Sequence, residues 1–338
     1  MRKNRRYRMW NITRGRQILS ICAAVITLVC AACGERARPV KRIAIFQIKP
    51  QEWADALKLG FADGLQEQGL DVGRDVVVIT KSAAGDPLGI TTLAQTLVKQ
   101  NYSAIYALGT QASQEVFQAA SNDQPLIFGA VTDPVQTGFY DGSLDRPRKN
   151  ITGTQDLWPY PAQFDLIKAL IPNLQKLGIV YNSSEINSQV SVGFIKQECT
   201  KRGIQLIERT VTDDSQVSLA VAGVLTVGIQ AFFIPADNTA QSNAQVIIAA
   251  CMNKRVAVFT GIPGIVENGA VATVGTNYYQ LGKVNAAQAA KILSGTPARQ
   301  IPVQIADKGD LYLNMVSIKK LGLTVPEQLR KTAIKVYE

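Results

Sequence analysis

Eight short runs of apolar, β-forming residues recur along this 338-residue chain in two groups of four. The runs start at residues 43, 76, 104 and 126 in the first group and at residues 177, 204, 231 and 256 in the second. Continuous apolar runs are typical of strands buried on both faces, as in parallel sheets covered by helices. Because the starts within a group lie 22 to 33 residues apart, each strand has room for a following helix. The spacing therefore predicts βα units rather than a solenoid.

The segments between the runs carry helical patterns. In the first of them, apolar residues recur at every fourth position and so share one helix face: Trp53, Leu57, Phe61 and Leu65. On this face Trp53 is interpreted as a core residue, with stacking against a ligand as the alternative.

A polar loop at residues 141–149 separates the two groups, and a β-rich run at 271–274 with a helix at 279–293 follows the second. The chain is therefore expected to cross more than once between two doubly wound parallel-sheet lobes joined by a multi-strand hinge, which is an α/β fold. The expected boundaries are residues 42–154 plus about 271–305 for lobe one, and residues 155–270 plus about 306–338 for lobe two. Ligands of such folds bind in the crevice at the carboxyl ends of the strands.

The net charge of +10 is concentrated at the N-terminus, where seven Lys and Arg residues and no acid lie in the first 17 positions. The remaining +3 is close to neutral and gives no reason to expect a nucleic-acid partner. An apolar run of 12 residues follows at 18–29 and is too short for a bilayer, which needs about 20. This order of segments is typical of a secretory signal peptide. An uncleaved membrane helix and a basic DNA-binding arm are the alternatives.

The sequence Val29-Cys30-Ala31-Ala32-Cys33-Gly34 resembles a bacterial lipobox, with Cys33 as the lipidated residue. Cys30 departs from the aliphatic residue that is usual there. We expect residues 1–32 to be a lipoprotein signal peptide and residues 33–41 to be a tether. The mature protein is then extracytoplasmic, tied by lipid to a membrane in the periplasm or at the cell surface.

The chain has no histidine, which excludes Ser-His-Asp and Cys-His catalysis and His-ligated zinc. The sequence also carries no nucleotide-binding or nucleophile motif, so we expect no enzyme activity, no cofactor and no metal. Of the cysteines beyond the signal peptide, Cys199 and Cys251 are interpreted as buried free thiols, with one disulfide as the alternative.

Polar residues follow the predicted strands, where they would face the cleft. The candidate ligand-binding residues are Gln47, Thr110, Gln111, Ala112, Thr132, Asp156, Asn182, Ser183, Ser184, Glu185, Asp237, Asn238 and Asn277. The segments 110–112 and 183–185 each open a helix, whose free N–H groups favour a carboxylate. Asp156, Asp237 and Glu185 can receive an ammonium group. The set suits a small zwitterion, although residues such as Ser183, Asp133 and Asn238 are also ordinary helix caps.

These stretches resemble the substrate-binding lipoproteins of ABC transporters typified by the tryptophan- and tyrosine-uptake systems. The resemblance runs through residues 42 to 325 and is carried by the segments 85–87, 129–134, 150–156, 177–188, 235–239 and 278–282. It implies a type I periplasmic binding-protein fold and delivery of a ligand, an aromatic amino acid in the first place, to a permease driven by an ATPase. It also implies that the 110–112 loop and Ser183–Ser184 hold the carboxylate and that Asp156 and Asp237 hold the ammonium.

One departure from the family bears on the ligand. Many relatives have an acidic residue and a histidine where this chain has Pro50 and Gln51. The alternatives left open are a binder of sugars or other small solutes, a ligand sensor, a lipoprotein enzyme and a repressor of the same fold. The strand ends offer few aromatic side chains for stacking on a sugar, and the signal peptide argues against a repressor.

Overall fold

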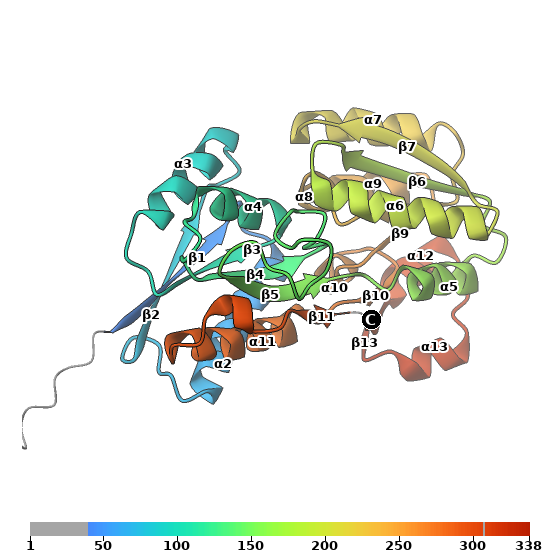
Figure 1. Ribbon diagram of the computed structural model, residues 1–338. Coiled ribbons are helices and arrows are strands. Elements are labelled where there is room, and N and C mark those ends of the chain that lie inside the picture. Colours follow the sequence, from blue (N-terminus) through green and yellow to red (C-terminus); the bar gives the residue numbers. More distant parts are fainter. Residues whose placement is uncertain (1–39, 307) are drawn as a thin grey trace, which may run out of the picture. The chain divides into compact units, whose positions relative to one another are not determined.

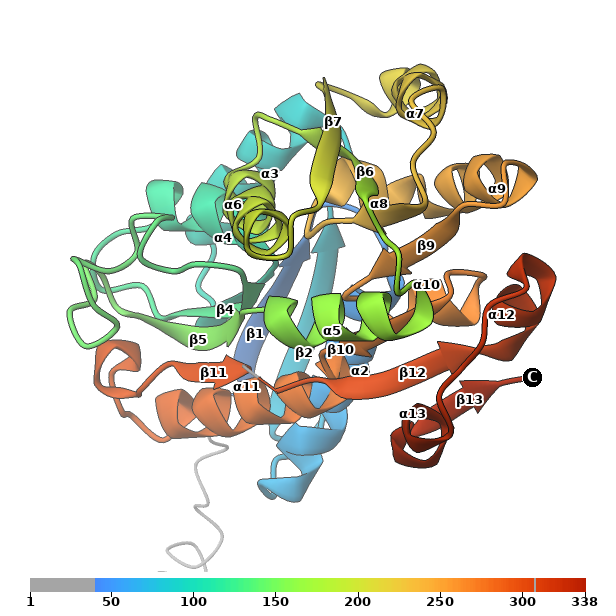
Figure 2. The same ribbon diagram turned by 90° about the vertical axis from the view of Figure 1, so that its right-hand side faces the viewer.

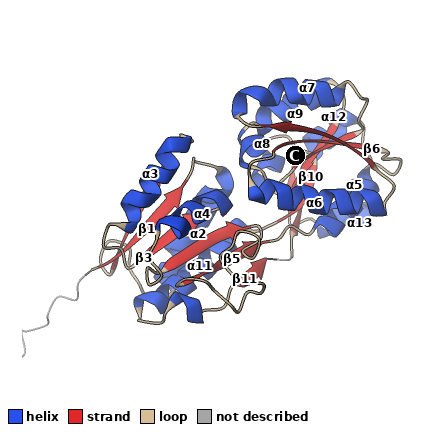
Figure 3. Cartoon of the chain, turned by 45° about the horizontal axis from the view of Figure 1, so that its top comes forward, coloured by secondary structure: helices blue, strands red, loops and turns tan. Residues whose placement is uncertain are grey.

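Two sheets, each with helices on both faces, account for the fold from Lys41 to Glu338 (Figure 1, Figure 3). The structure is a computed structural model that describes residues 40–306 and 308–338. The predicted signal peptide, Cys33 and the tether up to residue 39 lie outside the described residues. No helix in the described part of the chain is long and apolar enough to span a bilayer.

The first sheet has six strands in the order β11-β5-β4-β3-β1-β2, and every neighbouring pair is parallel. Its strands are β1 (Lys41–Gln47), β2 (Val76–Ser82), β3 (Ala104–Leu108), β4 (Leu126–Val131), β5 (Ile151–Asp156) and β11 (Gln304–Ala306). The helices of this lobe are α2 (Glu52–Glu67), α3 (Pro87–Val98), α4 (Thr110–Ala119) and α11 (Tyr278–Leu293), with the short η2 (Ala298–Gln300). Helices α3 and α4 lie on one face of the sheet, and α2 and α11 pack together on the other (Figure 1).

The second sheet has seven strands in the order β13-β12-β10-β9-β8-β6-β7. Its strands are β6 (Lys176–Asn182), β7 (Gln205–Val211), β8 (Ala231–Ile234), β9 (Ala257–Thr260), β10 (Ala272–Gly275), β12 (Asp310–Asn314) and β13 (Lys335–Tyr337). Its helices are α5 (Tyr160–Leu170), α6 (Ile186–Lys201), η1 (Asp214–Gln216), α7 (Val217–Leu225), α8 (Asn238–Ser242), α9 (Ala244–Asn253), α10 (Pro263–Glu267), α12 (Met315–Leu321) and α13 (Glu327–Thr332).

All eight predicted runs are strands, and the predicted multi-strand crossing between the lobes is present. The chain passes from the first sheet to α5 after β5, returns after β10 to α11, and leaves again between β11 and β12 (Figure 2). The structure differs from the expected boundary at residue 271, because β10 pairs with β9 and β12 and so belongs to the second sheet. The return crossing therefore follows β10.

The second sheet is also not wholly parallel, since β12 runs antiparallel to β10. Strand β10 leads toward the crossing and β12 leads away from it, so two neighbouring strands at this edge point in opposite directions. The apolar runs could not indicate this reversal, because a short strand carries the same residue pattern in either direction.

Within the core, three residues of the predicted α2 face, Leu57, Phe61 and Leu65, are fully buried. Trp53, the first residue of that face, is only partly buried and lies at the start of α2. Its interpretation as a core residue is therefore wrong in part, because the helix begins at the cleft rather than inside the sheet packing. Cys199 and Cys251 are both buried and free, and burial raises the pKa of each thiol to about 12.

Candidate functional site

A cavity of about 30 Å³ lies where the carboxyl ends of the strands of the two lobes meet. Its walls come from both lobes and comprise Trp53, Gly109, Thr110, Ala130, Thr132, Asp156, Trp158, Asn187, Ala236, Asp237, Asn238, Gln241, Ile262 and Tyr278. We call this space the central cavity. Its position agrees with the expectation that ligands bind at the carboxyl ends of parallel strands.

The structure gathers five of the candidate residues around the central cavity: Thr110, Thr132, Asp156, Asp237 and Asn238. Gln47 and Gln111 line a smaller pocket of about 10 Å³ that shares Trp53, Gly109 and Asn238 with the central cavity. The other six candidates line neither of these two pockets: Ala112, Asn182, Ser183, Ser184, Glu185 and Asn277.

Asp156, the last residue of β5, is a buried carboxylate in the cavity wall with neutral partners. Thr276 donates to Oδ1 at 2.6 Å, while the Tyr278 hydroxyl and the Trp158 indole donate to Oδ2 at 2.8 and 3.1 Å. Burial raises the pKa of Asp156, and the three hydrogen bonds oppose that rise. None of its hydrogen-bond partners in the described part of the chain carries a charge, so a cation in the cavity would be its first counter-charge.

Asp237 faces the same cavity but is held by its own lobe. It caps α8 by accepting the Ala240 N–H, and it also accepts the Asn182 N–H at 2.6 Å and the Ser188 hydroxyl. Burial and the neighbouring Glu185 carboxylate raise the pKa of Asp237 to about 7. The carboxylate thus joins the ends of β6, α6 and α8, which gives it a structural role whatever the cavity holds.

Asn187, in the first turn of α6, lines the central cavity and was not among the candidate residues. Its amide Nδ2 donates to Glu185 Oε2 at 3.0 Å and to the Ala236 carbonyl at 2.8 Å. These two bonds fix the orientation of the amide. The side chain is 7% exposed, and its Oδ1 has no hydrogen-bond partner among the described residues. Because a buried acceptor without a donor is costly, Asn187 Oδ1 is a natural partner for a donor on a ligand.

Helix α4 begins at the cavity without a side-chain cap. Its N-cap is Gly109, whose φ of 81° lies in the left-handed region that favours glycine. A Cβ at this position would also lie 3.0 Å from Cη2 of Trp53. The first N–H groups of the helix and its dipole are therefore available to an anion in the cavity, as the sequence predicts for the 110–112 segment.

Ala130 is held toward the cavity by an irregularity in β4. Its φ is 56°, and the pairing of β4 with β5 changes register between Phe128 and Val131. The Ala130 N–H is satisfied by the Thr154 hydroxyl at 3.2 Å. Left-handed non-glycine residues cost energy and gather at functional sites, so this bulge is a feature of the site.

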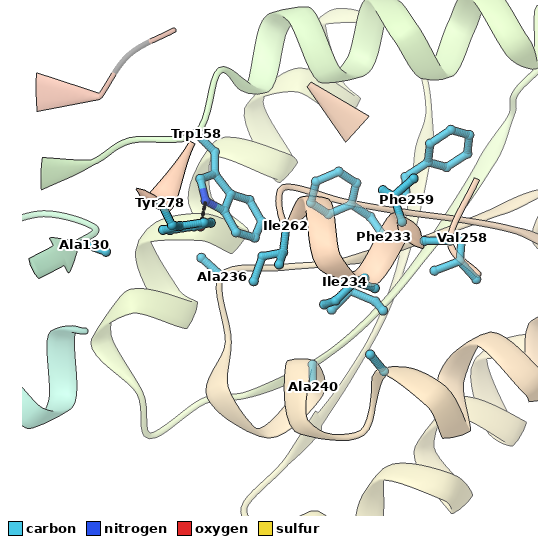
Figure 4. Close-up of a cluster of buried hydrophobic side chains, with 14 of the residues drawn as sticks. Ala130, Trp158, Phe233, Ile234, Ala236, Ala240, Val258, Phe259, Ile262 and Tyr278 are labelled. Atoms are coloured by element: carbon cyan, nitrogen blue, oxygen red, sulfur yellow. Dashed lines mark hydrogen bonds between the residues drawn. The ribbon is translucent and has the colours of Figure 1, made fainter. Parts of the chain in front are cut away.

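Aromatic side chains form the rest of the wall. The Trp158 indole lies close against the Tyr278 ring and donates to its hydroxyl at 3.2 Å, with Ile262 and Ala236 beside them (Figure 4). A Cβ on Gly261 would fall 2.2 Å from the Trp158 ring, so only glycine leaves room for the indole there. The ring of Trp53 is tilted against that of Tyr278, with ring centroids 5.9 Å apart.

Several candidates outside the cavity serve local structure instead. Asn182 accepts from the N–H and hydroxyl of Ser184, and Asn277 caps α11. Glu185 accepts from Asn187, from the N–H of Asn238 at 3.0 Å and from Thr239. Ser183 and Ser184 are exposed, and Ala112 is buried inside α4. These contacts explain the residues without a ligand, which is the capping alternative that the sequence left open.

At the rim of the cleft, residues 49–52 reach across from the first lobe to the second. Lys49 forms an ion pair with Asp214 at 3.3 Å, and Gln51 donates to the Ser242 hydroxyl at 3.2 Å. Asn268 donates to Glu52 at 2.7 Å. These residues line an outer cavity of about 360 Å³ that also touches Trp53, Gln241 and Ile262. Pro50 and Gln51, which depart from the family pattern, therefore lie at the mouth of the site.

The site combines groups that can receive the two charges of a small zwitterion. A helix N-terminus faces anions, and Asp156 together with Asn187 Oδ1 faces cations and other donors. In the described residues no group of three metal-ligating side chains is close enough to hold a metal ion.

Comparisons with known proteins identify the family to which this chain belongs. The family model described as ABC transporter substrate binding protein matches residues 42–337. The chain is 29% identical over 283 residues to the tyrosine-binding protein of Clostridioides difficile (strain R20291), covering 84% of this chain and 81% of that relative.

Two solved structures extend the comparison, each 28% identical to this chain over 88% of it and 99% of the other chain. One is an ABC domain from Streptococcus pneumonia in complex with L-Trp, with a TM-score of 0.83. The other is the ligand-free, open structure of a substrate-binding protein with adhesive properties from Clostridium difficile, with a TM-score of 0.67. The chain belongs to the family of ABC transporter substrate-binding proteins and has the type I periplasmic binding-protein fold.

Proposed function

We propose that this protein captures an aromatic L-amino acid in the central cavity and delivers it to its ABC permease. The observation that carries the proposal is Asp156, a buried carboxylate in the cavity wall whose three hydrogen-bond donors are all neutral. A buried carboxylate is stabilised by a cationic partner, and the ammonium of an amino acid supplies one. Asn187 Oδ1 offers the same ammonium a second acceptor.

The carboxylate of the ligand is assigned to the N-terminus of α4. The free N–H groups of the first turn, next to Gly109 and Thr110, lie in the same cavity as Asp156. A zwitterion with its two charges a few bonds apart matches a site with opposite polarities on facing walls. The sequence-based assignment of Asp237 to the ammonium stays a prediction, and the contacts of Asp237 within its own lobe favour a structural role.

Two observations support an aromatic side chain on the ligand. Trp158 and Tyr278 line the cavity, and aromatic rings pack well against one another in offset or tilted arrangements. A relative named for tyrosine and a solved relative holding L-Trp share between a quarter and a third of their residues with this chain. The alternative of another small organic solute is favoured by no specific contact.

Solute-binding proteins of ABC importers work outside the cytoplasm, and the same holds for this family member. We propose that Cys33, after removal of residues 1–32, carries the lipid that ties the protein to its membrane, because Ala31-Ala32-Cys33 follows a short apolar run. The family binds solutes, and we propose no catalytic role for this member.

Isothermal titration of the soluble mature protein, residues 34–338, tests the proposal with a small panel of ligands. L-tyrosine, L-tryptophan and L-phenylalanine should bind. Desaminotyrosine, which lacks the ammonium, and tyrosinamide, which lacks the carboxylate, should each bind at least about tenfold more weakly than L-tyrosine, since each loses one charged contact. Glucose is the control for the sugar alternative. Binding of glucose with no response to any amino acid would overturn the proposal.

A further inference from the structure

The central cavity is too small for the side chain that the proposed function requires. Its volume is about 30 Å³, whereas a cavity that binds benzene measures about 150 Å³. One or two water molecules would fill the space. For an aromatic ring to enter, part of the present wall has to leave.

Trp53 is the part of the wall best placed to leave. Trp53 lines the central cavity, the small pocket beside Gln47, and two larger cavities of about 360 and 350 Å³. The indole therefore borders both the narrow central cavity and the two larger cavities. Rotation of this one side chain would join them and give room for a ring next to Trp158 and Tyr278.

The indole is also held by contacts that a ligand can replace. Trp53 is only partly buried, and its Nε1 donates to the side chain of Gln51, a residue at the rim. Its neighbours in the cavity include the tilted Tyr278 ring and Gly109. A ligand ring in the same place would make the same kind of contact with both.

Gln51 links the indole to the opposite lobe. Its Oε1 accepts from Trp53, and its Nε2 donates to the Ser242 hydroxyl at the end of α8. The position of the indole is thus connected to a contact that exists only while the two lobes are together.

We propose that Trp53 is a specificity-determining gate: its indole lies where the ring of the ligand goes, and it rotates toward the outer cavity when an aromatic amino acid binds. The proposal rests on the proposed function. A larger ligand ring requires a larger displacement of the indole, so Trp53 affects the binding of tryptophan more than the binding of phenylalanine.

Stopped-flow association of L-alanine, L-phenylalanine and L-tryptophan with the parent protein and with Trp53→Ala tests the gate. The variant should bind L-tryptophan at least about tenfold faster than the parent, L-phenylalanine several-fold faster, and L-alanine at the parent rate within about twofold, since alanine has no ring to place. Leu59→Ala, an exposed position on the same helix, is the matched control and should give parent rates. Slower or weaker binding of both aromatic ligands to Trp53→Ala would show a fixed wall and overturn the gate.

Fluorescence gives a second readout that does not depend on how well Trp53→Ala folds. Trp53 and Trp158 are the two tryptophans that follow the predicted signal peptide, so the difference between the parent and Trp53→Phe isolates the emission of Trp53. Saturating L-tyrosine should increase acrylamide quenching of Trp53, because the indole moves outward. A decrease would mean that the ligand shields the indole, which contradicts the gate and leaves the proposed function standing. If no aromatic amino acid binds either protein, the proposed function fails and the gate fails with it.

Discussion

The buried carboxylates of Asp156 and Asp237 line the same cavity, but their hydrogen-bond partners differ. Asp156 takes its hydrogen bonds from three side chains at the crossing between the lobes, whereas Asp237 takes two of its three from backbone N–H groups within one lobe. A carboxylate that accepts hydrogen bonds from backbone N–H groups stabilises the fold of the ligand-free protein. One that has only neutral side-chain donors is stabilised further by a cationic ligand.

The stability of the protein should depend on pH through Asp237. Its pKa is raised from 3.8 to about 7, so between these values the folded protein holds a proton that the unfolded chain releases. The free energy of unfolding therefore falls as pH rises toward about 7 and levels off above it. In Asp237→Asn this contribution is absent, and melting temperatures between pH 5 and pH 8 should vary less than in the parent. An unchanged pH dependence of the melting temperature in Asp237→Asn would contradict the raised pKa of Asp237. The affinity of the same variant for L-tyrosine tests whether Asp237 also pairs with the ammonium.

The sequence identified part of this site and missed part of it for a physical reason. Asp156 and Thr110 follow strands directly, and strand ends meet at one edge of a parallel sheet. Asn187 lies in the first turn of α6 and Gln241 near the end of the short α8, where a polar residue in the sequence does not by itself indicate a ligand contact. Trp53 fitted an apolar helix stripe, although the end of a stripe can lie in a cleft as well as in a core.

At the scale of elements, the N-terminus of α4 should be sensitive to its glycine. Gly109→Ala introduces a Cβ at a left-handed φ and 3.0 Å from the Trp53 ring, which shifts the first turn of the helix. We expect the affinity for L-tyrosine to fall about tenfold, since the N–H groups that receive the carboxylate move.

Gly138→Ala is the matched control for this prediction. Gly138 has a φ of 80°, and a Cβ added there would have no atom within 4 Å, so the substitution adds backbone strain without a steric contact. Both variants should lose stability, and only Gly109→Ala should lose affinity. Equal affinities in thermal-shift titrations would remove α4 from the site.

Most elements were predictable because apolar runs and helical stripes are local signals. Strand β5 was expected only through the boundary between the lobes at residues 154 and 155, and β11, β12 and β13 were not expected at all. Strand β12 lies between β10 and the edge strand β13, and the pairing of both depends on the path of the chain through the hinge. Long-range pairing of that kind leaves little trace in the local pattern.

At the scale of the whole molecule, ligand binding should draw the lobes together. The three polar bridges from residues 49–52 to the second lobe exist only when the rim is closed. The higher TM-score to the L-Trp complex than to the ligand-free, open relative is consistent with a closed arrangement. Small-angle scattering of the mature protein should show a smaller radius of gyration with saturating L-tyrosine than without it. An unchanged radius would indicate a rigid site.

The proposed anchor predicts the mature N-terminus. Mass spectrometry of the protein extracted from membranes should find a diacylglyceryl-modified peptide that begins at Cys33. Cys33→Ala should move the protein from the membrane fraction to the soluble fraction, because the lipid is the attachment. A mature terminus elsewhere, without lipid, would refute this part of the account.

The central claim is that Asp156 receives the ammonium of an amino acid, and calorimetric titration of Asp156→Asn with L-tyrosine tests it most directly. Losing one partner of a buried charged contact costs about 2–5 kcal/mol, so the affinity should fall at least about 30-fold. The melting temperature of the ligand-free variant should stay near that of the parent, because the asparagine removes a desolvated charge and keeps an acceptor. Asp123→Asn, at a side chain 94% exposed, is the control. Binding of L-tyrosine to Asp156→Asn within about threefold of the parent would contradict the account.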